Sequence, residues 1–261
     1  MSDWNPALYM RFASERTRPA AELVARIPLL SAQVHHVVDL GCGPGNSTQL
    51  LLEHFPEARV LGIDNSASML ASAMGNVPQA QFIEADITQW ASTSTQCAPD
   101  VIFANAALHW VSRHELLIPQ LFSLLAPGGV LAIQVPDNEM EPSHVIMREV
   151  ARLEQFAVDG AVGRAKILPP SDYYQLLASA GAESIDIWHS VYQHPMPSSQ
   201  AIVEWLRSTG LRTYTDALPA DLQSAFLTEY EKRVDAAYPP MVNGMRLLAF
   251  PRLFMVARRT V

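Results

Sequence analysis

The chain has 261 residues, of which 49% are hydrophobic, so it can bury a sizeable core as a single α/β domain with an elaboration. Its formal net charge is −8, which disfavours a protein that holds nucleic acid or anionic lipid through nonspecific electrostatics. Cys42 and Cys97 fit neither a disulfide framework nor a metal site, and no apolar run approaches a membrane span, so we expect a cytoplasmic protein that acts on small molecules, with no metal, nucleic acid or membrane as its partner.

From about residue 34 the sequence alternates short β-branched runs with helical stretches, which is typical of a doubly wound α/β sheet. Five strands are predicted, at residues 35–40, 59–64, 80–86, 100–106 and 130–135. The helices predicted between them cover residues 46–55, 67–74 and 115–125. The first of these helices is expected to take its N-terminal caps from Asn46, Ser47 and Thr48.

The pattern changes after the fifth strand. It predicts an irregular or helical segment, a helix, a strand, a long helical segment and a last strand, at residues 139–168, 171–180, 183–194, 199–238 and 253–258. The last strand is expected to pair antiparallel with the strand at 183–194. The predicted fold is Rossmann-like α/β, with seven mostly parallel strands in a single domain. Its parts are an N-terminal helical lid, a ligand-binding core and two cap segments, at residues 1–28, 29–136, and 139–168 with 195–250.

The sequence DLGCGPG follows the first strand, at the edge of the sheet where such folds bind ligands. Its glycines let the backbone turn tightly and approach a ligand closely. A dinucleotide fingerprint, GxGxxG, would need glycine at Asn46, so the spacing here is GxGxG. Asp64 ends the second strand, where a carboxylate can accept both ribose hydroxyls, and Asp86 ends the third. Three strand ends are therefore predicted to form one site.

Together these motifs resemble the class I S-adenosylmethionine-dependent methyltransferases, over at least residues 34–136. Further matching features are Ile87 after Asp86, Asn105-Ala106 ending the fourth strand, and APGG before the fifth. The resemblance implies S-adenosylmethionine as cofactor and S-adenosylhomocysteine as product. It places the glycine loop against the methionine part, Asp64 on the ribose, and Asp86 with Ile87 on the adenine. The implied cofactor-binding residues are Gly41, Cys42, Gly43, Gly45, Asp64, Asn65, Met69, Asp86, Ile87, Trp90, Asn105 and Ala106.

For Met69 and Trp90 the alternative to purine contact is core packing.

A closer resemblance is to the trans-aconitate methyltransferases. It extends over nearly the whole chain, cap included, in ERTRPA, DLGCGPGNST, ANAALHWV, PDNEMEPSH followed by MREVA, YYQLL, AIVEWLRSTGLR, AAYPP and FPRLF. It implies a carboxyl O-methyltransferase that forms the monomethyl ester of trans-aconitate or a related small polycarboxylate. Two other readings remain: methylation of another small acid or of a malonyl thioester on a carrier protein, and a non-catalytic S-adenosylmethionine-binding regulator.

A carboxylate has a pKa near 4 and is already a nucleophile at neutral pH, so this reaction requires no general base. We therefore predict catalysis by proximity and desolvation, with no catalytic acid or base. His109 is the candidate for such a role, and the alternative is a binding or packing histidine.

A tricarboxylate also needs cations, and a surface position is the alternative for every candidate arginine. The candidates are Arg16, Arg18, Arg148, Arg207, Arg212 and Arg252. The predicted substrate-binding residues are His109, Trp110, His144, Arg148, Tyr192 and Arg212. The negative charges of Asp137, Glu139 and Glu141 disfavour an anionic substrate next to the fifth strand unless these side chains turn outward.

Overall fold

The computed structural model describes residues 13–93, 98–158, 165–207 and 209–261, in two compact units. The larger, which we call the core unit, comprises residues 3–135, 165–189 and 253–261. The smaller, the cap unit, comprises residues 1–2, 136–164 and 190–252. No helix in the described ranges is long and apolar enough to cross a membrane.

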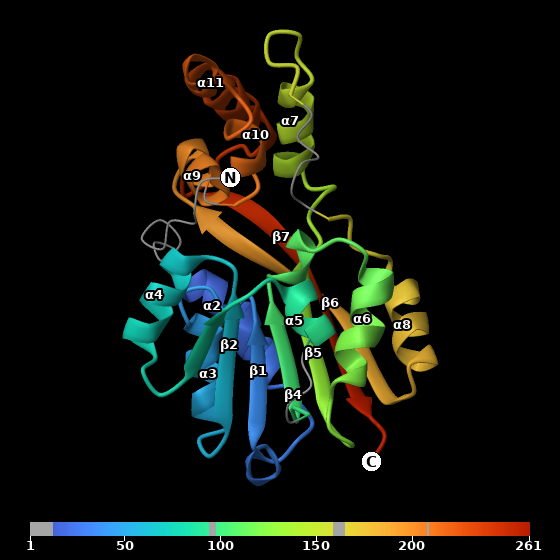
Figure 1. The fold of residues 1–261 in the computed structure, drawn as a ribbon. Helices are drawn as coiled ribbons and strands as arrows, with labels where there is room; N and C mark the ends of the chain where they lie inside the picture. The colour runs from blue at the N-terminus through green and yellow to red at the C-terminus, as the bar shows by residue number, and fades with distance from the viewer. Residues whose placement is uncertain (1–12, 94–97, 159–164, 208) are drawn as a thin grey trace. The chain divides into compact units, whose positions relative to one another are not determined.

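Seven strands form one sheet in the order β3-β2-β1-β4-β5-β7-β6 (Figure 1). Their bounds are β1 His36–Leu40, β2 Arg59–Asp64, β3 Gln81–Glu84, β4 Val101–Asn105, β5 Val130–Pro136, β6 Ala182–Met196 and β7 Arg246–Arg259. The first five pair in parallel. The predicted Rossmann-like fold is thus confirmed, and β7 lies beside β6 as expected.

Strand β7 runs antiparallel to β5. The Arg259 N–H donates to the Gly129 carbonyl over 2.8 Å, and the Asp137 N–H donates to the Pro251 carbonyl over 2.9 Å. The residue numbers therefore rise along one strand as they fall along the other, which is the antiparallel pattern. The predicted start of this strand, at residue 253, was wrong because β7 already begins at Arg246.

The helices of the core unit cover both faces of its sheet (Figure 1). Helices α5, α6 and α8 contribute to the apolar cluster on one face, and α2 packs against α3 on the other. The bounds are α2 Ala13–Val24, α3 Asn46–His54, α4 Ala67–Asn76, α5 Ile87–Thr93, α6 His114–Ser123 and α8 Pro170–Ser179, with 3₁₀ turns η1 Ser31–Gln33 and η2 Leu108–Trp110. Strand β4 is buried from Val101 to Ala104, as its unbroken apolar sequence requires.

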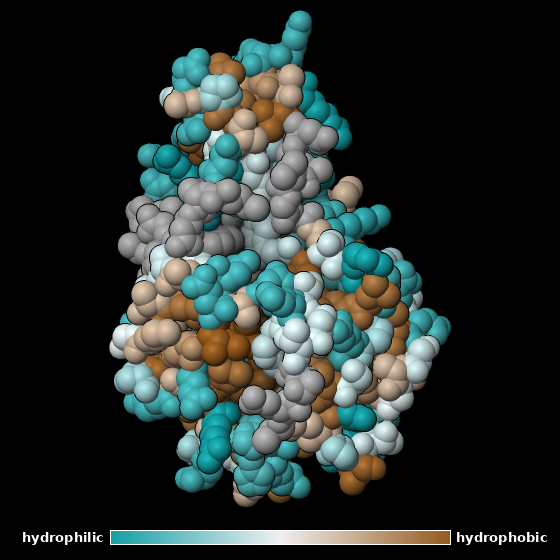
Figure 2. Space-filling view, in the orientation of Figure 1, coloured by the Kyte–Doolittle hydropathy of each residue, from teal (hydrophilic) through white to brown (hydrophobic). Residues whose placement is uncertain are grey.

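The sheet face that carries the apolar cluster is less covered toward the β3 edge. Ile63 is fully buried, but Leu61 is half-buried and Ile83, the parallel partner of Ile63, is 39% exposed. Figure 2 shows an apolar area where Figure 1 draws β1 and β2. The apolar surface of β2 and β3 therefore remains partly open to solvent.

The cap unit is mainly helical, with α7 Pro142–Ala151, α9 Ser199–Arg207, α10 Arg212–Thr215 and α11 Ala220–Ala237. Helix α11 packs against both α7 and α9. The long helical segment predicted at 199–238 is thus three helices, because Gly210 lies in the first break and Pro219 is the N-cap of α11. Within the predicted segment 139–168 the structure shows α7, and residues 159–164 lie outside the described ranges.

Candidate functional site

The glycine loop connects β1 to α3 with all three glycines at positive φ: Gly41 at +65°, Gly43 at +54° and Gly45 at +94°. A Cβ added at Gly41 would lie 2.4 Å from the Cβ of Ala107, and one at Gly45 would lie 2.9 Å from Val77 Cγ2. At Gly43 no described atom outside the loop lies within 4 Å of an added Cβ. Gly41 and Gly45 are therefore required by packing, whereas Gly43 faces space that a ligand can approach.

Helix α3 begins differently from our prediction. Its N-cap is Gly45, in the left-handed region, and no side chain caps it among the described residues. The hydroxyls of Ser47 and Thr48 donate instead to Asp39 Oδ2, over 2.8 and 2.7 Å. Asp39 is fully buried at the end of β1, and burial raises its pKa to about 7. Sequence reasoning assigned no role to this carboxylate, which anchors the start of α3.

Asp64, at the end of β2, is tied to the glycine loop. Its Oδ2 accepts the Gly43 N–H over 2.9 Å, and its Oδ1 accepts the Ser66 N–H over 2.9 Å. The next residue, Asn65, is exposed, and Met69 on α4 is 3% exposed. The structure thus joins the ends of β1 and β2 at Gly43.

Asp86 precedes α5 and accepts N–H groups from its first turn. Its Oδ1 accepts the N–H groups of Thr88 and Gln89, over 2.8 and 3.2 Å, as well as the Thr88 hydroxyl. The hydroxyl bond is the main cause that lowers the pKa of Asp86. Asp86 is exposed and therefore remains accessible to a ligand.

Ile87 lies beside the glycine loop, since its Cδ1 is 4.0 Å from a Cβ added at Gly41. Ile87 and Trp90 belong to the buried apolar cluster, so Trp90 has the core-packing environment that we named as its alternative. Cys42 is likewise buried, and burial raises the pKa of its thiol.

Asn105 is the last residue of β4 and Ala106 follows it, at the same edge of the sheet. Asn105 Oδ1 is buried and accepts no hydrogen bond from the described part of the chain. Ala106 has φ +52°, a conformation that an alanine rarely adopts. This turn leads into η2, where the His109 ring is 6% exposed and lies 4.8 Å from the Trp110 ring, centroid to centroid.

A buried histidine holds η2 in place. His114 Nε2 lies 2.8 Å from the Leu108 carbonyl and must donate, because a carbonyl only accepts. In the neutral ring Nδ1 then accepts the Tyr173 hydroxyl proton over 2.6 Å. The Tyr173 oxygen also accepts the Leu168 N–H over 3.2 Å. His114 and Tyr173 were not predicted as site residues, and their role is to position the turn that carries His109.

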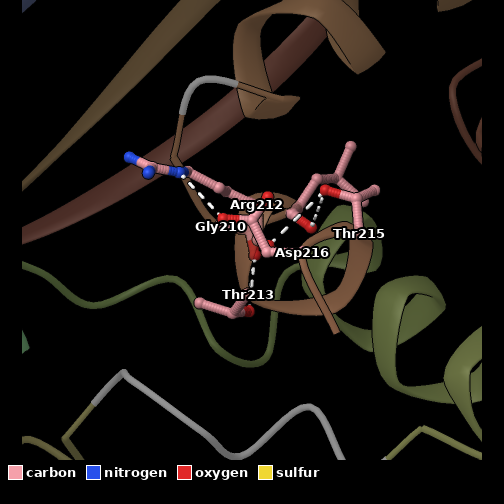
Figure 3. A network of polar contacts seen from close by, with 6 residues as sticks. Gly210, Arg212, Thr213, Thr215 and Asp216 are labelled. Atoms are coloured by element: carbon pink, nitrogen blue, oxygen red, sulfur yellow. Dashed lines mark hydrogen bonds and ion pairs between the residues drawn. The ribbon is translucent and has the colours of Figure 1, made fainter. Parts of the chain in front are cut away.

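The predicted cap-unit residues fall into different environments. His144 and Tyr192 are buried, whereas Arg148 is half-buried and donates from Nη2 to the Glu139 carbonyl over 2.7 Å. Arg212 forms an ion pair with Asp216 over 3.3 Å, within the polar contacts of α10 (Figure 3). Much of the charge of Arg212 is therefore met by the C-cap residue of its own helix.

The remaining arginine candidates also separate. Arg18 and Arg207 are exposed, and the side chain of Arg16 lies outside the described positions. Arg252, by contrast, is only 4% exposed. A second basic side chain of the cap unit, His194, is also buried, with 7% of its surface exposed. His194 was not predicted, since the alternation of its strand gives no sign of which histidine is buried.

The acids at 137, 139 and 141 are half-buried, and burial raises the pKa of Glu141.

A family described as "Methyltransferase domain" matches residues 37–129. Curated relatives named "Trans-aconitate 2-methyltransferase" match over almost their whole length: the one from Delftia acidovorans is 60% identical over 99% of both chains, and the one from Escherichia coli is 52% identical over 100% of both. The chain belongs to the trans-aconitate 2-methyltransferase family. It is an S-adenosylmethionine-dependent methyltransferase.

Solved structures agree on the fold at low sequence identity. The YcgJ protein of Bacillus subtilis has a TM-score of 0.58 at 13% identity and covers 94% of this chain and 99% of its own. A phosphoethanolamine N-methyltransferase 2 of Haemonchus contortus, solved in complex with S-adenosyl-L-methionine, has a TM-score of 0.56 at 14% identity and covers 94% of this chain and 53% of its own. At such identities the likeness concerns the fold alone.

The core unit offers the features that S-adenosylmethionine requires. The open approach at Gly43, the acceptor oxygens of Asp64 and the apolar side chain of Ile87 lie around one loop. Among the described residues, no group of His, Cys, Asp or Glu side chains is arranged to hold a metal ion.

Proposed function

We propose that the enzyme transfers the methyl group of S-adenosylmethionine to a carboxylate of trans-aconitate or a closely related small polycarboxylate, giving a monomethyl ester and S-adenosylhomocysteine. The observation that carries this proposal is the 51–60% identity to the first relatives of that name over 99–100% of this chain. Shared sequence of this extent includes the cap unit as well as the glycine loop, and acceptor recognition depends on more than the cofactor motifs.

When bound, S-adenosylmethionine supplies an electrophilic methyl group on a sulfonium. The acceptor carboxylate forms the new O–CH₃ bond, the S–CH₃ electron pair remains on sulfur, and no proton is transferred. The protein therefore has to align oxygen, carbon and sulfur and to exclude water, and alignment alone can supply up to about 7–11 kcal/mol. His109 and Trp110, fixed by the His114–Tyr173 pair, are proposed to border the acceptor rather than to act as acid or base.

The cofactor-binding assignment follows from the core-unit geometry. Gly43 is proposed to face the methionine part, Asp64 the ribose, and Asp86 with Ile87 the adenine. The other residues proposed around the cofactor are Gly41, Cys42, Gly45, Asn65, Met69, Trp90, Asn105 and Ala106. The buried free oxygen of Asn105 supports its place in this set, because a polar atom without a partner in the described chain is suited to a ligand donor.

The remaining assignments are proposals of the same kind. We propose residues 1–28, of which 1–12 lie outside the described ranges, as a lid. Residues 29–136 are proposed as the cofactor-binding core, and residues 139–168 and 195–250 as substrate-side caps. A net charge of −8 supports an enzyme that uses neither nucleic acid nor an anionic membrane as partner. The cytoplasmic location is proposed because Cys42 and Cys97 do not suggest a disulfide framework.

The decisive experiment incubates the purified chain with methyl-labelled S-adenosylmethionine and, separately, trans-aconitate, cis-aconitate, isocitrate or citrate. We expect a base-labile labelled ester with trans-aconitate and the highest kcat/KM for it. Label transferred to a malonylated carrier protein but to none of the four acids would replace the proposal by that alternative. Binding of S-adenosylhomocysteine without transfer to any acceptor would favour a non-catalytic binder.

A further inference from the structure

The segment that forms helix α4 meets the glycine loop at both of its ends. At one end Asp64 Oδ2 accepts the Gly43 N–H over 2.9 Å. At the other end the Asn76 side chain donates from Nδ2 to the Pro44 carbonyl over 2.9 Å. Two successive residues of the loop are therefore held by residues 64 and 76, which lie just before α4 and at its last position.

The start of α4 fixes the first of these contacts. The Ser66 N–H donates to Asp64 Oδ1 over 2.9 Å, and the Ser66 hydroxyl accepts the Met69 N–H over 3.3 Å as the N-cap of the helix. The carboxylate that holds Gly43 is thus itself tied to the first turn of α4.

The end of α4 packs closely behind the loop. Val77, the C-cap residue, is 1% exposed and Ala73 is fully buried. A Cβ added at Gly45 would lie 2.9 Å from Val77 Cγ2 and 3.5 Å from Ala73 Cβ. Close packing therefore limits movement of the loop toward α4 at Gly45, and the Asn76 amide fixes the direction of the Pro44 carbonyl.

These constraints matter because the loop is rich in glycine. Gly41, Gly43 and Gly45 all adopt positive φ, and glycine loses more conformational freedom on ordering than any other residue. A loop that is ordered before its ligand arrives loses less entropy on binding. The apparent affinity falls with the fraction of molecules in which the loop has the binding conformation.

We infer that Asn76 is a positioning residue for S-adenosylmethionine: its amide holds the Pro44 carbonyl and so keeps the adjoining Gly43 backbone in the conformation to which the cofactor binds. This inference rests on the proposed assignment of the glycine loop to the methionine part of the cofactor. Asn76 was not among the predicted site residues, and it lies beyond the helix expected at residues 67–74.

Two substitutions test whether the amide donor is required. Asn76→Ala removes the donor, and Asn76→Asp keeps the shape but places an acceptor opposite the Pro44 carbonyl. Asn76 is exposed, so its hydrogen bond competes with water. We therefore expect the Kd for S-adenosylhomocysteine, measured by isothermal titration calorimetry, to rise about 2- to 10-fold in Asn76→Ala and at least as much in Asn76→Asp.

The same helix offers a matched control. The Ser72 hydroxyl donates to the Ser68 carbonyl over 3.2 Å, so Ser72→Ala also removes a hydrogen bond from a side chain of α4 to a carbonyl, but that carbonyl lies outside the loop. This variant should bind S-adenosylhomocysteine with an unchanged Kd.

Steady-state kinetics separate positioning from a loss of folded enzyme. In Asn76→Ala the KM for S-adenosylmethionine should rise along with the Kd, while kcat and the acceptor KM at saturating cofactor stay unchanged. A role in stability alone would instead lower kcat through the amount of folded enzyme and leave the KM for S-adenosylmethionine as it is.

Hydrogen exchange of the loop amides, followed by NMR, requires no turnover. In ligand-free Asn76→Ala the Gly43 and Gly45 N–H groups should exchange faster than in the unaltered chain and in Ser72→Ala. Saturating S-adenosylhomocysteine should remove the difference, because the bound ligand then orders the loop.

The outcomes distinguish this inference from the assignment on which it rests. An unchanged Kd in Asn76→Ala, an Asn76→Asp variant that binds as tightly as the unaltered chain, or equal exchange of the loop amides would each overturn the role of Asn76. An equal rise of the Kd in Ser72→Ala would overturn it as well, since that variant leaves the loop contact intact. If Gly43→Ala binds S-adenosylhomocysteine as tightly as the unaltered chain, the assignment of the loop to the cofactor fails instead.

Discussion

Gly43 and Gly45 lie in one loop but differ in what an added methyl group would meet. At Gly43 no described atom outside the loop lies within 4 Å of the new Cβ, whereas at Gly45 Val77 Cγ2 would lie 2.9 Å away. A left-handed conformation costs an alanine roughly 1–2 kcal/mol at either position. Overpacking at Gly45 adds typically about 1–3 kcal/mol. Gly43→Ala should therefore lower the free energy of unfolding by roughly 1–2 kcal/mol, and Gly45→Ala by about 2–5 kcal/mol.

Of the two substitutions, Gly43→Ala should weaken cofactor binding more, although it lowers stability less. A methyl group at Gly43 would occupy space proposed for the methionine part of the cofactor, so Gly43→Ala should raise the Kd for S-adenosylhomocysteine on the order of 10- to 100-fold. Urea denaturation measures the stability of each variant, and isothermal titration calorimetry measures the Kd. Gly75→Ala is a suitable control, because Gly75 lies in α4 without positive φ and with open space around its Cβ.

The control should be stabilised by roughly 0.5–1 kcal/mol and should bind the ligand normally. A Gly43→Ala variant that binds S-adenosylhomocysteine as tightly as the unaltered chain would refute the assignment of this loop to the cofactor. A stability loss at Gly43 as large as that at Gly45 would refute the reasoning about packing.

Three other predictions concern buried or site-lining polar groups. Asp39 has a pKa of about 7 when folded and near 4 when unfolded, so the folded chain retains a proton between these values and its stability falls as pH rises. Urea denaturation at pH 5 and at pH 8 measures this fall in the free energy of unfolding, which should be smaller in Asp39→Asn by roughly 2–3 kcal/mol. Equal falls in the variant and the unaltered chain would contradict the raised pKa of Asp39. Tyr173→Phe leaves His114 Nδ1 and the Leu168 N–H without this partner and should cost about 1–3 kcal/mol, with an unchanged Kd for S-adenosylhomocysteine as the check. Asp64→Ala should raise that Kd at least about tenfold and hardly change the acceptor KM at saturating cofactor; the reverse pattern would move Asp64 out of the cofactor site.

The parallel half of the sheet was predictable because most of its strands are short, largely apolar runs, and the central ones, such as β4, are buried. Residues 59–64 and 101–105 are apolar, β-branched runs bounded by loops, and the structure places β2 and β4 there. The last strand was predicted too short because Pro251 interrupts its apolar run, and proline normally marks the end of a strand. In the structure Pro251 stays within β7, where its carbonyl accepts the Asp137 N–H and its missing N–H is tolerated.

The start of α3 shows a different limit. Ser47 and Thr48 follow a glycine loop, and hydroxyl residues at that position usually cap a helix. Here both hydroxyls donate to buried Asp39, so a tertiary hydrogen bond replaces the local one. An acid that ends an apolar strand just before the loop was the available signal for this arrangement.

The cationic residues separate by burial, which the sequence does not show. Arg148 and Arg212 stood out because they lie in family-like segments, yet one donates to the Glu139 carbonyl and the other pairs with Asp216. Arg252 and His194 are brought together by the pairing of two strands that are separated in sequence by α9, α10 and α11. An exposed arginine is hydrated by water, whereas a buried guanidinium depends on hydrogen bonds and charges from its surroundings. Burial, more than the number of arginines in the chain, therefore separates Arg252 from the other arginine candidates.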